Sequence, residues 1–574
     1  MKNKFLLISA TFLCAFNVNA QDIKATEVRV TEQFIPAIPE ASKLNEQATF
    51  SDTIKVDKTQ KYAISQHSLK ADYKTRPLKA AKVKAETIPK LYGSKVSIGF
   101  GDNWNTRATI AHNSSRSKTL NYGLLLNHFS NKYKLPLNYT VSGLYPHISN
   151  SSYLAQNSKN NMHLYAKKIK GDYIFLANID YDRRTAVWFP EDINEILKNY
   201  RNRFAYTKFS ISAISKENTS NKMIRNATFF LSDLNEMSEN QIHLSTNLSK
   251  TINGFPINLE IELNDYLNYN NSDSRFESAD VKSLHFSPST SITKFGLDFN
   301  LGLALLYFTD DTPFEIFPQI KITKELVKDV LLVYGGIRHS QQRHTIKSLS
   351  DENPYIHSYG TNQSILGASS NGYLLQDLRT TDTDELYVAM RNVLGKDEVF
   401  NGGIACGRVV NFAHFVRNYS PNYNRFSIGY EDVWQLHINA NYDKKINNII
   451  SLNANADYYN WDKEVYHKPN FTCKLSAPIN LRDKIKVAPS LSYMSMRFSM
   501  QEFNGVNHVP LPSPDNGVSE LPAQFHFNLG LQYNYSKILS AYLQLNNLTN
   551  SKKELFSGYQ EIGFNGVFGL SYAF

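Results

Sequence analysis

The side chains able to do chemistry are scattered along this chain, and none stands at a spacing that defines a catalytic or metal site. Fifteen histidines are present, but no His-Glu-x-x-His or Cys-x-x-Cys pattern occurs. Such patterns bring two ligands to one metal ion. There is also no Gly-x-Ser-x-Gly nucleophile elbow and no phosphate-binding loop. The sequence therefore predicts no catalytic, cofactor-binding or metal-binding residues, and no enzyme.

A histidine–aspartate pair at the edge of a loop is the one catalytic arrangement that the residues leave open. His339 and His344 lie near the start of the longest polar stretch, 341–383, and Asp351 follows within it. An imidazole held by a carboxylate can act as a general base. Polar loop residues are usually solvated, and we expect these three to be so.

Two cysteines remain once the leader, which contains Cys14, is set aside. Cys406 and Cys473 could form one disulfide in an oxidising compartment. Two cysteines do not make a disulfide framework, so we expect two unpaired cysteines in strands.

The elements that must position these side chains are strands, and the pattern is clearest in residues 525–574. Side chains alternate between the two faces of a strand, so every second residue shares a face. One face here is apolar: Phe525, Phe527, Leu529, Leu531, Tyr533, Tyr535, then Phe564, Phe568, Leu570, Tyr572 and Phe574. The other is neutral and polar, with Val567 as an exception: His526, Asn528, Gly530, Gln532, Asn534, then Asn565, Gly569, Ser571 and Ala573. An apolar outside and a neutral polar inside are typical of a membrane barrel.

Hairpins of this kind continue back to Lys95. Short connections alternate with long ones, which is typical of a barrel with turns on one side of the membrane and loops on the other. The short ones lie at 170–172, 253–254, 328–329, 443–447, 482–483 and 536–537. The long ones lie at 131–160, 190–201, 268–278, 341–383, 417–432, 500–523 and 549–560. Representative strands between them are 295–307, 434–442 and 450–458.

This count gives about eleven loops and about ten turns, and so an all-β antiparallel transmembrane barrel of roughly 22 strands, with any even number from about 16 to 22 open. The mean hydropathy of −0.40 excludes a bundle of membrane-spanning helices. A barrel is compatible with that value because its lumen, loops and turns are polar.

The chain begins with a secretory signal in residues 1–20. Lys2 and Lys4 precede an apolar run, and Val18-Asn19-Ala20 forms a small-residue cleavage site. Loss of the two lysines lowers the formal charge from +10 to +8. This excess forms no basic stripe, so we expect no nucleic-acid partner. Residues 21–94 have weak periodicity and several prolines, and we expect a short N-terminal segment on the periplasmic side or in the lumen.

The close of the chain resembles that of TonB-dependent receptors of bacterial outer membranes. The similar residues are Leu543–Asn550, Gly558-Tyr559, Gly563–Asn565 and the aromatic last strand. The resemblance implies a cell-outer-membrane location in contact with lipid, and a terminal signal for the barrel-assembly machinery at Phe568, Leu570, Tyr572 and Phe574. It also implies a box for strand pairing with TonB at Thr26, Glu27, Val28, Arg29 and Val30. The family's plug domain is longer than residues 21–94, so the plug is reduced or replaced by a linker.

The resemblance implies that residues 95–574 form a channel or receptor that takes up a nutrient or small solute. TonB or another outer-membrane protein would be its partner. A different class of function stays open, because a full plug is missing: a non-transporting barrel subunit or scaffold of an outer-membrane assembly or biogenesis complex.

Overall fold

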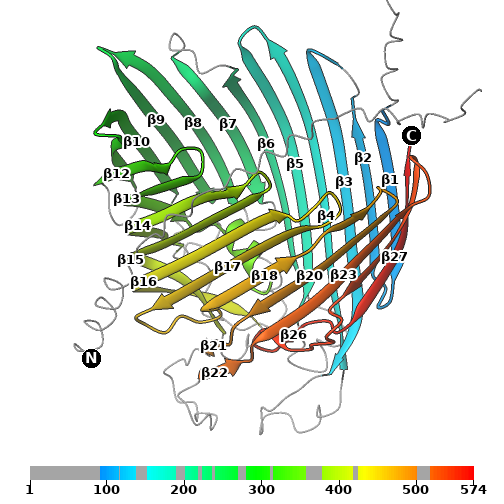
Figure 1. Cartoon of the computed structure of the whole chain (residues 1–574). Coiled ribbons are helices and arrows are strands. Elements are labelled where there is room, and N and C mark those ends of the chain that lie inside the picture. The colour runs from blue at the N-terminus through cyan, green and yellow to red at the C-terminus, as the bar shows by residue number, and fades with distance from the viewer. Residues whose placement is uncertain are drawn as a thin grey trace, which may run out of the picture. The chain divides into compact units, whose positions relative to one another are not determined.

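Alternating apolar and polar side chains build a closed antiparallel β-barrel (Figure 1). The computed structural model describes residues 91–114, 117–136, 152–188, 201–216, 223–234, 239–268, 280–309, 314–356, 378–417, 425–500 and 518–574. Within these residues the main sheet has 23 strands. Because β18 and β19 both pair with β20, they are two parts of one wall strand, and the barrel has 22. The predicted fold class and strand number are confirmed.

The wall strands follow one another around the barrel in chain order. The first half of the wall comprises β1 (Ser94–Gly101), β2 (Thr106–Asn113), β3 (Leu120–Pro136), β4 (Ser152–Lys170), β5 (Tyr173–Val187), β6 (Arg201–Ser215), β7 (Ile224–Leu234), β8 (Glu239–Ile252), β9 (Phe255–Asn268), β10 (Val281–Lys294) and β11 (Leu297–Phe308). The second half comprises β12 (Phe314–Val327), β13 (Leu331–Arg343), β14 (Thr380–Gly395), β15 (Glu398–Arg417), β16 (Phe426–Lys445), β17 (Ser451–Trp461), β18 (Phe471–Ser476), β19 (Ile479–Leu481), β20 (Ile485–Met494), β23 (Gln524–Asn534), β24 (Leu539–Asn546) and β27 (Asn565–Ala573).

The long connections contain three further elements within the described residues. These are the helix α3 (Ile346–Glu352), the hairpin of β21 (Arg497–Met500) with β22 (Val518–Leu521), and the hairpin of β25 (Glu554–Phe556) with β26 (Tyr559–Gln560). We call the end of the barrel with these elements the outer end. It lies at the bottom of Figure 1, opposite the C-terminus.

The first and last strands close the barrel. β1 pairs with β27 from Lys95↔Ala573 to Gly101↔Val567. The pairing extends to the last residue, because Ser94 and Phe574 exchange backbone hydrogen bonds of 3.1 and 2.9 Å. Closure pairs the two ends of the sheet with each other, which lets a β-structure span a lipid bilayer. Residues 94 and 574 lie at the inner end with the short turns, which in bacterial outer-membrane barrels faces the periplasm.

The outer face of the wall is apolar, as the alternation predicts. In β27 and just beyond it, Phe568, Leu570, Tyr572 and Phe574 are 49–59% exposed, whereas Val567 is fully buried. Val567 therefore lies on the lumen face with Asn565 and Ser571, and it does not disturb the facing of the strand. The barrel thus presents the lipid-facing surface of an outer-membrane protein. No helix within the described residues is long and apolar enough to cross a membrane.

Tight turns join the hairpins at the inner end. Asn253 and Gly254 both have positive φ, as a two-residue hairpin turn that matches the strand twist requires. Phe295 was expected to begin a strand, and this was wrong. It forms a turn with Gly296, both at positive φ, and its side chain is 86% exposed. The apolar alternation continued into the turn and concealed it.

Several predicted loops are shorter than expected, because polar strands extend beyond the membrane. The stretch 131–160 was expected to be a loop, but β3 continues to Pro136 and β4 begins at Ser152. The turn expected at 443–447 lies at 446–450, since β16 continues to Lys445. β15 and β16 have 20 residues each, twice the roughly ten that cross a bilayer. The outer part of β16 contains Ser427, Gly429, Glu431 and Asp432, and the predicted loop 417–432 therefore included it.

Candidate functional site at the outer mouth

The connection between β13 and β14 folds into the barrel. It begins with α3, which Thr345 caps: its side chain accepts a hydrogen bond from the backbone of Ser348, whose hydroxyl accepts one from the backbone of Thr345. This reciprocal pair satisfies two backbone donors and starts the helix at a defined residue. We call residues 344–356 the inward loop.

Polar side chains on the lumen face of the wall hold the inward loop. Glu239 of β8 accepts hydrogen bonds of 2.6 and 3.2 Å from the backbone N–H groups of Ile346 and Lys347. A carboxylate here satisfies free donors at the start of the helix. Lys347 itself lies 3.4 Å from Asp182 of β5.

The far end of the inward loop is held by β6 and β5. Asn202 is fully buried and donates to the carbonyls of Pro354 and Ile356, at 2.9 and 2.8 Å. Arg184 donates to the carbonyls of Ser350 and Asp351, at 3.1 and 3.0 Å. These anchors lie opposite the exposed apolar residues of their strands, so the loop lies against the lumen side of the wall.

An apolar core crosses the outer mouth from one wall to the other. It joins β3, β4, β6 and β7 through the inward loop to β15, β16 and the β25–β26 hairpin. Its thirteen buried members are Tyr133, Leu135, Tyr153, Ala155, Phe204, Leu234, Ile346, Leu349, Ile356, Phe415, Phe426, Phe556 and Tyr559. Tyr355 stacks on Tyr559 with ring centroids 3.5 Å apart, and burial raises its pKa well above the ordinary value. We call this set the mouth bridge.

Two histidines in the outer connections are buried beside the mouth bridge. His467 lies against the rings of Phe426 and Phe556, and its Nδ1 donates to the carbonyl of Phe415 at 2.8 Å. Burial lowers its pKa to about 3. His344 is hydrogen-bonded to Thr381, and burial with the nearby Lys468 lowers its pKa to about 4. Both imidazoles are therefore neutral at pH 7.

The three residues considered for catalysis do not converge. The expectation that they are solvated was wrong for His339 and His344, which are buried. His339 is paired with Asp384 and His344 with Thr381, whereas Asp351 is paired with Lys347. Cys406 and Cys473 are free, on different strands, as expected. The TonB-box-like residues Thr26–Val30 lie outside the described residues.

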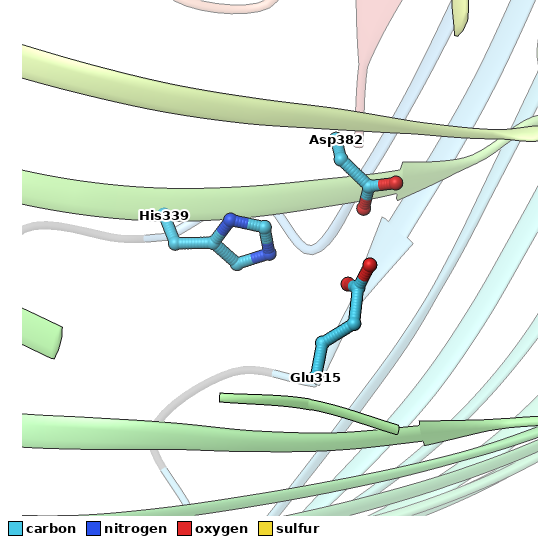
Figure 2. A group of neighbouring side chains, drawn as sticks. All are labelled: Glu315, His339 and Asp382. Carbon is cyan, nitrogen blue, oxygen red and sulfur yellow. The ribbon is translucent and has the colours of Figure 1, made fainter. Parts of the chain in front are cut away.

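A cluster that the sequence did not indicate lies where β12 and β13 separate. Their pairing ends at Ile320↔Ile337, whereas β13 stays paired with β14 as far as Arg343↔Thr380. Beyond that point His339 stacks on Phe317, on the lumen face of β12, at 3.6 Å between ring centroids. This arrangement brings Glu315, His339 and Asp382 together (Figure 2).

Each member of the cluster offers one ligand atom, and these atoms lie within 4.8 Å of one another. The residues stand on three strands and are far apart in the chain, so a search for short ligand spacings does not find them. The only sequence signal was the polar character of the outer strand ends, which many solvated residues share.

A pocket of about 700 Å³ lies on the inner wall nearer the short turns. Three cations, Lys95, Arg107 and Lys486, take part in its lining, which contains no carboxylate. Arg107 donates to the Gln544 side chain at 2.5 Å. This part of the lumen is electropositive.

No protein-family model and no curated protein sequence matches the chain. Solved structures do. A variant of the ferric enterobactin receptor of Pseudomonas aeruginosa, bound to enterobactin, is 10% identical over 84% of this chain and 81% of that chain, with a TM-score of 0.58. The ferric-catecholate import receptor Fiu of E. coli K12 is 10% identical over 84% and 82%, with a TM-score of 0.53.

A copper transporter, OprC, is likewise 10% identical over 85% of this chain and 82% of that chain, with a TM-score of 0.52. At this identity the likeness concerns the fold alone. The fold is that of TonB-dependent receptors, as the resemblance of the last strands indicated.

Proposed function

We propose that this chain is an outer-membrane receptor that takes up a nutrient or small solute through the barrel. One observation carries the proposal: the inward loop and the mouth bridge cross the outer mouth of a 22-strand polar lumen. A barrel of this size encloses a wide lumen. A transporter must obstruct it until a solute binds, and outer connections folded into the mouth can do so.

The receptor and transporter names of the fold neighbours support the same class of function. The electropositive pocket nearer the periplasmic end favours an anionic solute, because a cluster of one sign of charge raises the local concentration of the opposite sign. In this proposal residues 21–94 form a reduced plug or linker, Thr26–Val30 pair with TonB, and the last strand is read by the assembly machinery.

A non-transporting scaffold barrel is the second candidate, and the mouth bridge also favours it. Thirteen buried apolar residues form a core, and a core resists opening more strongly than a few polar contacts do. In a scaffold this core would be a permanent seal.

Purification of the chain from its native outer membrane in mild detergent tests the choice. The receptor proposal predicts a barrel without a stoichiometric outer-membrane partner, and cross-linking of residues 26–30 to TonB. A stoichiometric partner that stays bound through purification, without that cross-link, would favour the scaffold. A chain in which Val28→Pro has been introduced is the control, because proline removes a backbone donor from a pairing strand.

A further inference from the structure

Glu315, His339 and Asp382 form a junction between two separated parts of the barrel wall. Glu315 belongs to β12, and the other two belong to β13 and β14, which no longer pair with β12 at this level. The cluster thus faces the gap that opens where the β12–β13 ladder ends. Figure 2 shows the imidazole of His339 directed toward the two carboxylates.

His339 is held so that one of its two ring nitrogens can bind a metal ion. Its side chain is only 3% exposed, and its Nδ1 lies 2.8 Å from the carboxylate of Asp384. An ionised carboxylate only accepts hydrogen bonds, so Nδ1 holds the proton and Nε2 holds the lone pair. Nε2 is buried and has no hydrogen-bond partner. A carboxylate behind the imidazole is the usual support of a metal-binding histidine, since it fixes tautomer and ring orientation.

Neighbouring side chains also hold His339 and Glu315 in place. Phe317 stacks on the imidazole with the planes 4° apart, so the ring cannot rotate freely. Gln341 donates to the carboxylate of Glu315 at 3.1 Å. A cation between these two carboxylates would offset their mutual repulsion.

The distances between the three ligand atoms suit a metal ion with ordinary metal–ligand bond lengths. Donors about 2.1 Å from one metal ion stand roughly 3 to 4 Å apart, so the present separations need to close by about 1 Å. One imidazole with two carboxylates suits a divalent ion of intermediate softness. Calcium and magnesium prefer oxygen alone, and copper(I) prefers sulfur.

We propose that Glu315, His339 and Asp382 bind a divalent transition-metal ion of the zinc, manganese or iron(II) type, which joins β12 to the β13–β14 hairpin. The site lies outside the mouth bridge and does not depend on which solute the barrel moves. Asp384 is its positioning residue.

Zn²⁺ is the probe, used with the full mature chain in detergent, without a histidine tag and after treatment with a chelator. Calorimetric titration should show about one saturable ion per chain at micromolar concentration. Co²⁺ should give visible absorption bands that Zn²⁺ removes. Absence of saturable binding at micromolar Zn²⁺ would overturn the proposal.

Single substitutions locate the ion. His339→Gln, Asp382→Asn and Glu315→Gln should each weaken Zn²⁺ binding by at least about tenfold, and Asp384→Asn by about 10- to 100-fold. The last variant leaves all three ligands in place, so a purely structural role for Asp384 predicts no loss. Glu315→Gln and Asp382→Asn are near-isosteric and keep the test valid if His339→Gln does not fold.

His437→Gln is the matched control. His437 also pairs with a carboxylate, Asp457 at 3.0 Å, and stacks on an aromatic ring, Tyr459 at 4.2 Å. It belongs to no group of three potential ligands among the described residues. Its variant should keep the affinity for Zn²⁺ within about twofold. Equal losses in His437→Gln and His339→Gln, or none in either, would show that the ion binds elsewhere.

Discussion

Asn202 is one of the wall residues that hold the inward loop directly. Both of its loop contacts go to backbone carbonyls, of Pro354 and Ile356, and the side chain is fully buried. Substitution Asn202→Ala leaves these acceptors without their donor in a dry site. Such a loss costs about 1–3 kcal/mol per buried group.

We therefore expect Asn202→Ala to speed hydrogen–deuterium exchange in residues 346–356 and to leave the rest of the barrel unchanged. Asn178→Ala is the control, because Asn178 donates to Ser210 within the wall, at 3.2 Å. Equal exchange in the two variants would mean that Asn202 does not hold the loop.

His344 and His467 make the outer connections sensitive to acid. Their folded pKa values, about 4 and about 3, lie below the unfolded value of about 6.5, so the unfolded state binds more protons. Their contribution is fully present above pH 6.5 and is lost as the pH falls toward 4 and then 3. Each histidine should lower the free energy of unfolding by about 2–3 kcal/mol when the pH falls to 4.5.

Burial raises the pKa of Glu239, which holds the start of the loop, to about 7, so its protonation stabilises the folded loop as the pH falls and opposes the two histidines. The two histidines together outweigh this single carboxyl, so hydrogen exchange in residues 345–356, corrected for the intrinsic rate, should be faster at about pH 4.5 than at about pH 7.5. A double variant, His344→Gln with His467→Asn, should remove most of this difference. His128→Gln, a substitution in the wall, should not. A difference that survives in the double variant would assign the acid response to other groups.

The closing strand β27 is the element on which we expect assembly to depend. Phe574 is 59% exposed on the lipid side, while its backbone pairs with Ser94 across the closure. Phe574→Ser should lower the amount of folded barrel in the membrane without lowering synthesis, because lipid-facing apolar area and the proposed assembly signal are both lost.

Ala573→Ser, one residue away on the lumen face, should have a much smaller effect. Folded barrel is measured by its faster migration on a denaturing gel before boiling. Equal losses of folded barrel in the two variants would show that assembly does not depend on which face of the strand carries the substituted side chain.

The strands were predictable because each is encoded locally. In β27 a period of two separates the lipid-facing from the lumen-facing side chains. In the β8–β9 hairpin, Asn253-Gly254 specifies the turn without any contribution from distant residues. Phe295 shows the limit of that signal, since an apolar residue in a turn continues the alternation. The inward loop and the metal-ligand cluster were not predictable. Asn202 meets Ile356, and Glu315 meets Asp382, only because the barrel curves and the β12–β13 ladder ends.

At the scale of the whole molecule, we propose that two obstacles occupy the lumen. The mouth bridge stands at the outer end. The N-terminal segment, residues 22–90, is the candidate for the second. If this segment were the only obstacle in the lumen, its removal alone should raise ion conductance. The mouth bridge changes that expectation. When two obstacles lie one after the other along a pore, removing one leaves the other to limit the current, so the conductance stays low.

Planar-bilayer conductance of four chains tests this arrangement: the mature chain, a chain without residues 22–90, a chain without residues 346–356, and a chain without both. We expect low conductance in the first three and an increase of at least about tenfold in the last, because an unobstructed barrel of this size passes water and ions. The migration shift on boiling confirms that each chain is folded. High conductance after removal of 346–356 alone would place residues 22–90 outside the lumen. Low conductance in the double deletion would mean that other connections seal the barrel, and the scaffold function would then be favoured over uptake.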